Sequence, residues 1–386
     1  MNLFKISLIS LGIMSTPLHA SVFEFGDAKT TVGSIKASGF LRAKFQDKDY
    51  STSDHSLKFD AAKINLDYQN PYLTGHVEYR CYQFDKLCDF SSLVDAWIGY
   101  DINPAQNIKV GMQSLPFGPA RFWESNYYGG INTQVGIEDI HNLGIQYQFK
   151  PASSTSINLG YFPTDAGRYH GENGEASRYT ANLIESDDPE HTRLKEKNMW
   201  VGRINQQLDF LESEHLTVAV GGSYWYSTIE NKNLDIDGHR KAWNLFSEIA
   251  YDDLKLTLTG GRNTLDSRDQ THPDLSTFGS FDDQYMVANK GDFYTADLSY
   301  TFKDVYPGVS VMPYAMYSTY RKDLSDAGNS TRNIIGASID YKNISFVTEY
   351  IMGKNDPLVG GGADALAQGS ANERNNLLNL TFLYFF

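Results

Sequence analysis

Residues 376–386 read NLLNLTFLYFF, and the alternation within this stretch decides the fold of the chain. Apolar side chains at every second position share one face of an extended segment. They are Leu378, Leu380, Phe382, Tyr384 and Phe386, while Asn379 and Thr381 fall on the other face. A strand with one apolar face suits a closed membrane barrel, in which the last strand pairs with the first. A core strand of a soluble sheet would show the same alternation, so the rest of the chain must separate the two structures.

The pattern of residues at the N-terminal end of the chain predicts that the protein is exported. Lys5 supplies a positive charge, residues 6–14 form a short apolar run, and residues 18–20, LHA, place a small residue at a cleavage site. This order of features is typical of a secretory signal, so residues 1–20 are expected to be removed after Ala20. The apolar run is shorter than the roughly 20 residues of a membrane helix, and no other stretch approaches that length.

Alternating segments recur along the whole chain, whereas helical periodicity never persists for more than about two turns. In the first segment, for example, Ile35 and Leu41 alternate with Lys36 and Arg42. Sixteen segments of this kind lie near residues 34–45, 58–68, 72–80, 92–101, 106–113, 141–149, 155–162, 199–208, 215–228, 240–251, 254–263, 292–302, 309–318, 333–341, 344–351 and 376–386. The pattern predicts an all-β chain.

The connections between these segments alternate between short and long. Seven short ones carry turn-forming residues such as Asn70-Pro71. Eight long ones lie near residues 46–57, 81–91, 114–140, 163–198, 229–239, 264–291, 319–332 and 352–375. A soluble β-sandwich has no reason to place every long loop at one end. We therefore predict a transmembrane antiparallel β-barrel of about 16 strands over residues 34–386, with long extracellular loops, short periplasmic turns and a periplasmic N-terminal segment at residues 21–33.

Composition agrees with that fold and disfavours some partners. Aromatic residues make up 13% of the chain, as the two interfacial girdles of a membrane barrel require. The formal charge of -14 disfavours a nucleic acid as partner, because a phosphate-binding surface is basic. Cys81 and Cys88 lie close together in an exported chain, which favours a local disulfide over two free thiols in an oxidising compartment.

The sequence carries no motif for catalysis or for a cofactor. It lacks a G-x-S-x-G nucleophile elbow, an H-E-x-x-H zinc motif and a P-loop, and its histidines are scattered singly. The acidic run at residues 185–190, ESDDPE, lacks the glycine-punctuated spacing of a calcium loop and is interpreted as a solvated surface loop. We therefore expect neither an enzyme nor a metal or cofactor site. A barrel of this size leaves room for an aqueous channel.

Charged side chains on the polar faces of the strands are candidates for the lining of such a channel. The early strands offer a basic wall of Lys36, Arg42, Lys44, Lys63, Arg80 and Lys109, and the later strands offer an acidic wall of Glu248, Asp297, Asp340 and Glu349. The loop at residues 114–140 adds Arg121, Glu124, Glu138 and Asp139. If that loop folds inward, these charges would set a transverse field across a narrow opening. The alternative is that they are scattered, solvated lumen residues paired locally, such as Glu78 with Arg80.

Four features of the chain resemble known families. The plan of strands and loops resembles the trimeric porins of Gram-negative bacteria, and the ending with Phe382, Tyr384 and Phe386 resembles the signal by which outer-membrane barrels are recognised for assembly. Residues 110–118, VGMQSLPFG, are similar to the G-Q-x-x-x-P-F-G stretch that precedes the constriction loop in the phosphate-selective porin O/P family; residues 94–100, VDAWIGY, fit that family's preceding strand. The resemblance implies an outer-membrane homotrimer in contact with lipid and lipopolysaccharide, inserted by the barrel assembly machinery, with an inward-folding third loop.

These features together predict a passive diffusion channel for small hydrophilic solutes and ions. One alternative is a substrate-selective channel: phosphate would require a denser ladder of Arg and Lys, and a sugar would require a longer aromatic track than Phe40, Trp97 and Trp225 provide. The other alternative is a plugged barrel that acts as a surface receptor or adhesin. Conductance separates the two classes, because a plugged barrel should carry little current.

Overall fold

The computed structural model describes residues 23–51, 57–119, 121–123, 125–209, 213, 215–370 and 374–386. The expected signal peptide, its cleavage site and Glu124 lie outside the described residues. Within the described residues, no helix is long and apolar enough to cross a membrane.

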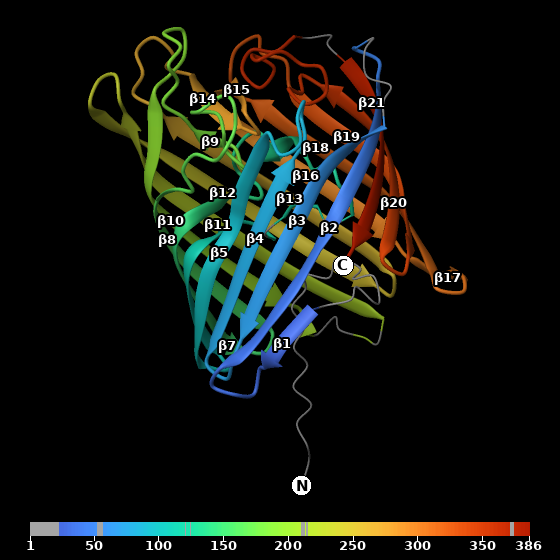
Figure 1. Cartoon of the computed structure of the whole chain (residues 1–386). Helices are drawn as coiled ribbons and strands as arrows, with labels where there is room; N and C mark the ends of the chain where they lie inside the picture. The colour runs from blue at the N-terminus through green and yellow to red at the C-terminus, as the bar shows by residue number, and fades with distance from the viewer. Residues whose placement is uncertain are drawn as a thin grey trace.

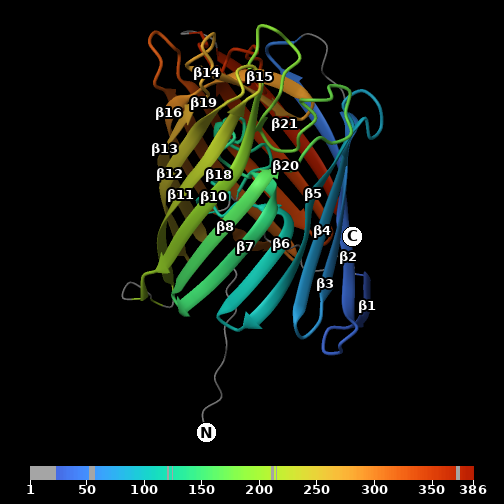
Figure 2. The same cartoon turned by 90° about the vertical axis from the view of Figure 1, so that its left-hand side faces the viewer.

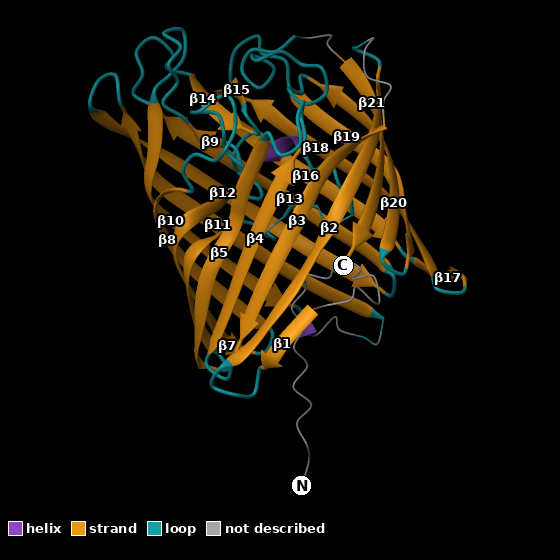
Figure 3. Cartoon of the chain, in the orientation of Figure 1, coloured by secondary structure: helices purple, strands orange, loops and turns teal. Residues whose placement is uncertain are grey.

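Sixteen long strands of the described chain close into one antiparallel barrel (Figures 1 and 3). In order around the barrel they are β2 (Gly33–Lys48), β3 (Leu57–Gln69), β4 (Leu73–Tyr82), β5 (Phe90–Asn103), β6 (Gln106–Ser114), β7 (His141–Ala152), β8 (Thr155–Asp165), β10 (Leu194–Gln207), β11 (Leu216–Asn231), β12 (Ile236–Tyr251), β13 (Leu254–Asp266), β16 (Lys290–Tyr300), β18 (Val309–Lys322), β19 (Ser330–Tyr341), β20 (Ile344–Lys354) and β21 (Arg374–Phe385). The short turns gather at one end, here called the turn end, and the long connections at the other, the loop end (Figure 2). The all-β, sixteen-stranded fold expected from the sequence is confirmed.

The C-terminal strand closes the barrel. β21 pairs with β20 on one side and with β2 on the other, where Leu380 lies opposite Phe45. Two backbone hydrogen bonds between Gly39 and Phe386 complete this seam, with nitrogen–oxygen distances of 3.0 and 3.1 Å. Closure pairs the strand edges with one another, which is the condition for a sheet to span a membrane.

The two faces of β21 follow the expected alternation only in part. Phe382 and Tyr384 are 47% and 45% exposed on the outer face, where lipid lies. The inner face carries the expected polar residues, but also Leu377 and Leu383, which are fully buried. These leucines share an apolar cluster with Trp123 of the third loop. The inner face is therefore not polar throughout, because an inward-folding loop covers part of it.

Five shorter strands lie at the two ends of the barrel in the described chain. At the turn end, β1 (Phe23–Asp27) pairs with the start of β2, and β17 (Phe302–Tyr306) pairs with β18. At the loop end, β9 (Asn182–Leu183), β14 (Leu275–Ser280) and β15 (Asp283–Ala288) form a small separate sheet (Figure 1). This sheet joins the long loop after β8 to the long loop after β13.

The connection between β6 and β7, residues 115–140, is the third long loop, and it packs inside the barrel. It contains the short helix η1 (Ile131–Thr133), drawn in purple in Figure 3, and Ile131 is fully buried. The backbone nitrogen of Ile131 donates to Ser318 Oγ on β18 at 2.9 Å. Near its start, Gly118 has a φ of +69°, a conformation that suits glycine and turns the chain away from β6.

Candidate functional site

A cavity of about 2110 Å³ occupies the barrel interior. At the loop end it is lined by Asp85, Glu172 and Asp282, which come from three different long loops. At the turn end it is lined by Asp252 and Gly308, which come from two different turns. The cavity therefore runs from the loops to the turns. A channel needs such a path, and a barrel filled by a plug lacks one.

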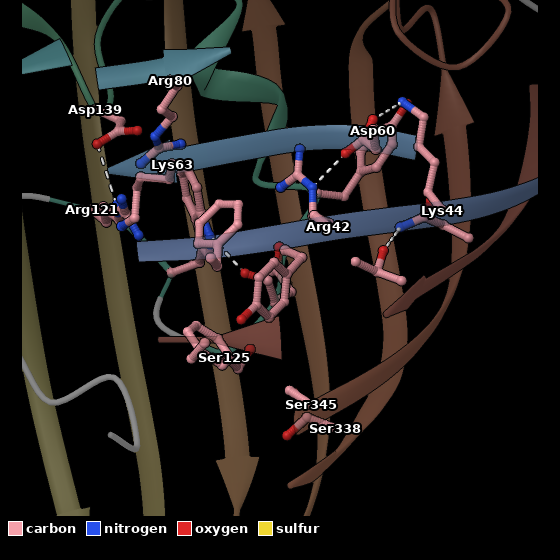
Figure 4. A pocket seen from close by; sticks show the side chains of 18 of the residues that line it. Arg42, Lys44, Asp60, Lys63, Arg80, Arg121, Ser125, Asp139, Ser338 and Ser345 are labelled. Atoms are coloured by element: carbon pink, nitrogen blue, oxygen red, sulfur yellow. Dashed lines mark hydrogen bonds and ion pairs between the residues drawn. The ribbon is translucent and has the colours of Figure 1, made fainter. Parts of the chain in front are cut away.

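The middle of this cavity carries cationic side chains from neighbouring strands (Figure 4). Arg42 and Lys44 lie two residues apart on β2, so both face inward. Both bind the carboxylate of Asp60 on β3: Arg42 through Nε, and Lys44 at 2.5 Å between Nζ and Oδ1. One carboxylate is thus shared between two cations.

A second carboxylate is shared in the same way. Lys63 of β3 lies opposite Arg80 of β4 in the strand register. Lys63 Nζ lies 3.4 Å from Glu78 Oε2, and Arg80 Nε lies 2.5 Å from Glu78 Oε1. This pair also leaves one positive charge in excess.

The third loop adds the fifth cation. Arg121 Nε lies 3.3 Å from Asp139 Oδ1, and His141 Nε2 on β7 lies 3.3 Å from the same oxygen. We call the five cations of this region the basic row: Arg42, Lys44, Lys63, Arg80 and Arg121. They contact three carboxylates, those of Asp60, Glu78 and Asp139, which leaves an excess of two positive charges.

Neutral hydroxyl groups line another part of the same cavity. Ser125 of the third loop, Ser338 of β19 and Ser345 of β20 lie apart from the basic row in Figure 4. Asp340 lines the cavity beside them and accepts a hydrogen bond from Ser338 at 3.0 Å. The hydroxyl protons of Ser125 and Ser338 are thus donated to Asp297 and Asp340, so an anion in the middle of the cavity would meet its cationic partners on the side of the basic row.

Two residues expected in an acidic wall hold the third loop instead. Asp297 accepts hydrogen bonds from the backbone N–H of Ser125, at 3.1 Å, and from its hydroxyl. Glu349 accepts from the backbone N–H of Tyr127 at 2.8 Å and from the Tyr314 hydroxyl at 3.0 Å. Asp297 is 3% exposed and Glu349 is fully buried. Buried carboxylates need such donors, and here the third loop supplies several of them.

Three inward-facing arginines of the wall bind carbonyl oxygens of the same loop. Arg203 of β10 donates to the carbonyl oxygen of Gly118 at 3.2 Å, and Arg240 of β12 donates to that of Gly136 at 2.6 Å. Arg332 of β19 donates to the carbonyl oxygens of Gly129 at 3.2 Å and Gly130 at 3.1 Å. Guanidinium groups and carboxylates from the strands thus satisfy both kinds of loop backbone group, N–H and C=O. The position of the loop is therefore set by the walls around it.

Two adjacent carboxyl groups of the third loop differ in environment. Burial raises the pKa of the Glu138 carboxyl well above its usual range, although the backbone N–H of Phe122 donates to it at 2.6 Å. Burial acts in the same direction on Asp139, but Arg121 and His141 outweigh it and hold the pKa of that carboxyl well below its usual range. The firmly ionised acid of this part of the loop is therefore Asp139.

The remaining expected wall residues lie elsewhere. Lys36, near the turn end of β2, lies 3.7 Å from Glu24 of β1, and Lys109 of β6 lies 4.2 Å from the centre of the Trp97 ring. Glu248 accepts a hydrogen bond from the side chain of an asparagine on β10 at 3.1 Å. None of these three expected residues is among the described residues that line the cavity. Of the ten expected wall residues, five are among the described residues that line the cavity: Arg42, Lys44, Lys63, Arg80 and Asp340.

The structure joins Cys81 and Cys88 in a disulfide, with their Cα atoms 5.0 Å apart. The bond closes the second long loop at the end of β4. Within the closed segment, Phe84 and Asp85 line the cavity. The disulfide therefore restrains a segment that forms part of the mouth.

Asp60 is a site residue that the sequence pattern does not reveal. The register of β2 and β3 shifts between Arg42, opposite Ala61, and Ala43, opposite Phe59. Asp60 is the extra residue of this β-bulge, and a bulge breaks the period of two. Strict alternation would place Asp60 on the outer face, but the structure places it inside at 4% exposed.

No family model matches the chain, and no curated protein matches it in sequence. Solved outer-membrane proteins are similar to it in fold. The outer membrane channel DcaP of Acinetobacter baumannii superposes with a TM-score of 0.61 at 12% identity, over 93% of this chain and 99% of that chain. OmpF of Salmonella typhi, solved with daunomycin, superposes with a TM-score of 0.60 at 13% identity, over 94% of this chain and 100% of that chain. The trimer form of OmpT, an outer membrane protein of Vibrio cholerae, superposes with a TM-score of 0.54 at 12% identity, over 92% of this chain and 99% of that chain.

Proposed function

We propose that the protein is an outer-membrane channel through which small hydrophilic solutes and ions diffuse passively. The observation that carries this proposal is the cavity that reaches from the long loops to the turns. The fold shared with DcaP and OmpF supports a place in the outer membrane of a Gram-negative bacterium. The trimer form of OmpT supports a homotrimer. In the outer membrane such a homotrimer would be in contact with lipid and lipopolysaccharide. The barrel assembly machinery would recognise the strand that ends with Phe382, Tyr384 and Phe386.

Within this function we propose a preference for anions. The basic row carries two positive charges in excess of its carboxylates and lies in the middle of the cavity. Charges near the narrow part of a pore decide which ions pass, whereas charges far from it act through screened fields. The formal charge of -14 on the whole chain therefore need not set the selectivity.

Selectivity for phosphate is a narrower candidate, motivated by the resemblance of residues 110–118. Its support in the cavity is the same basic row, whose cations all have carboxylate partners. A multiply charged anion would have to compete with those carboxylates. A general preference for small anions does not require the solute to displace these carboxylates from the cations.

The experiment that tests the channel is single-channel recording in a planar bilayer under a KCl gradient. We expect steady conductance in three equal steps and a reversal potential on the chloride side. Correctly folded protein that carries no current would refute the channel and leave a surface receptor or an enzyme. Block of the chloride current by low concentrations of phosphate would support the phosphate-selective candidate.

Removal of two cations from the basic row should weaken the anion preference. The double variant Arg42→Gln with Arg80→Gln leaves Asp60 paired with Lys44 and Glu78 paired with Lys63, so no carboxylate loses both partners. A unit charge about 10 Å from an ion in water contributes about 0.4 kcal/mol, with opposite sign for chloride and potassium. Two such charges change the difference between the ions by about 1.6 kcal/mol, which screening over a Debye length of about 10 Å lowers to about 0.6 kcal/mol. We therefore expect the chloride-to-potassium permeability ratio to fall about threefold. Reversal potentials measure this ratio.

The matched control for this prediction is Lys36→Gln, which removes a cation from the same strand, β2, away from the cavity lining. It should leave the permeability ratio unchanged. An equal change in the control and the double variant would mean that overall charge, not the basic row, sets the selectivity.

A further inference from the structure

Five aromatic rings pack together at the loop end of the cavity. They come from β4, β5 and three different long loops and form what we call the aromatic cluster: Tyr82, Phe84, Phe90, Tyr179 and Phe281. The ring centres of Phe281 lie 5.5 Å from Tyr82 and 5.6 Å from Tyr179, and those of Phe84 and Phe90 lie 5.7 Å apart. These separations are those of interacting aromatic pairs.

Part of the aromatic cluster faces the open cavity. Phe90 is fully buried behind the others, but Phe84 is 38% exposed and Phe281 is half-buried, and both line the cavity. A cluster that only held the loops together would keep its rings out of the lumen. The exposed rings therefore offer an apolar surface to a solute that enters the mouth.

The backbone holds one of these rings in an unfavourable conformation. Phe281 has a φ of +49°, in the left-handed region that bulky residues rarely adopt. The next residue, Asp282, fixes this turn, because its carboxylate accepts backbone N–H groups of Glu172 at 2.6 Å and Asn173 at 2.9 Å. Phe281 and Asp282 are the two residues that join β14 to β15, and a two-residue hairpin turn favours positive φ at both positions. The turn therefore fixes the place of the Phe281 backbone at the mouth of the cavity.

The aromatic cluster is continuous with the basic row. Arg80 Cζ lies 5.1 Å from the centre of the Tyr179 ring, and Arg80 Nη1 donates to the Tyr82 hydroxyl at 3.3 Å. A solute in contact with the exposed rings therefore lies beside a guanidinium group. An anionic group on that solute could pair with this cation.

Carboxylates around the mouth limit which anions fit. Asp85, Asp89, Glu172, Asp282 and Asp283 all line the loop end of the cavity. Repulsion from them grows with the charge of the entering ion. A single negative charge on an apolar body is repelled least and gains most from the rings, because burial of apolar surface is favourable.

We propose that this vestibule is a binding subsite for singly charged organic anions with an aromatic or apolar body. The body rests on Phe84 and Phe281, and the anionic group points toward Arg80. The subsite concentrates such solutes at the entrance of the channel, whereas small inorganic anions meet only the basic row. The inference rests on the proposed channel function and names a substrate class for it.

The test compares benzenesulfonate with methanesulfonate, which share one singly charged head group and differ in the body. Reversal potentials against chloride give the permeability ratio of the two ions, and calorimetry on the folded protein in micelles gives binding without any current. We expect benzenesulfonate to bind more tightly and to permeate better, although it is larger. The double variant Phe84→Ser with Phe281→Ser should lower the ratio of benzenesulfonate to methanesulfonate about three- to tenfold, as expected for lost aromatic contacts.

The matched control is Leu87→Ser, the same kind of change in the same disulfide-closed segment, at a side chain that is 68% exposed and not among the described cavity-lining residues. It should leave the ratio unchanged. A channel that conducts with equal ratios in the wild type and the double variant, or in which the control lowers the ratio equally, would overturn the subsite and leave the channel function intact. Benzenesulfonate binding that the double variant loses, in a protein without conductance, would support the subsite and overturn the channel function.

Discussion

Replacement of Arg332 by alanine is expected to lower the free energy of unfolding by about 3–5 kcal/mol, because it leaves a buried charge without its partner. The Arg332 side chain is fully buried and binds both carboxylate oxygens of Asp356, each at 2.6 Å. The same guanidinium donates to the carbonyl oxygens of Gly129 and Gly130. The variant should therefore also loosen the third loop. Denaturant titration in lipid vesicles measures the stability, and current noise in the open channel reports the loop.

Two further variants separate the effect of the buried charge of Arg332 on stability from its effect on the position of the third loop. Arg321→Ala removes an exposed arginine from the neighbouring strand β18, and it should change neither the free energy of unfolding nor the current noise. The double variant Arg332→Leu with Asp356→Leu removes both buried charges, so it should recover much of the stability while the current stays noisy. Quiet current in the double variant would show that the carbonyl contacts of Arg332 do not hold the loop.

Leu380→Arg should cost about 2–4 kcal/mol of stability, because it places a charge on the lipid face in the middle of β21. The matched change is Ser345→Arg on the neighbouring strand β20, whose side chain lines the cavity and lies opposite Asp340 in the register. That variant should fold with nearly wild-type stability and should narrow the channel. Refolding into vesicles with denaturant titration compares the two. Equal stability would mean that the inner and outer faces have been assigned the wrong way round.

The strands could be predicted because two different solvents act on the two faces of the sheet. Lipid outside and water or loop inside impose a period of two on β21 and on the other strands in turn. The prediction weakens where lipid ends. β10 begins at Leu194, five residues before the alternating segment near 199, and Leu194 is fully buried among loops. Beyond the bilayer the strand continues without an apolar outer face, so the alternation of apolar and polar residues no longer indicates a strand there.

The site was less predictable for a different reason. Alternation gives the face on which a side chain lies but not what covers that face. Asp297 and Glu349 do lie on the inner face, yet the third loop covers them and takes their hydrogen bonds. Asp60 escaped the pattern altogether, because a bulge reverses its direction. The conformation of the loop depends on residues far along the chain, and no local stretch encodes such contacts.

The sequence distance of those contacts has a consequence for biogenesis. Tyr127 of the third loop binds a residue 222 positions later, and the hydrogen bond between Gly129 and Arg332 spans 203 positions. Contacts of such separation form late, because the intervening chain must be ordered first. A barrel with only its first eight strands in the membrane would hold this loop through Arg203 of β10, but it would lack the contacts from Arg240, Asp297, Arg332 and Glu349. The position of the third loop is therefore fixed only at the end of insertion, together with the seam between β2 and β21, and an arrested precursor would lack most of the contacts that hold this loop.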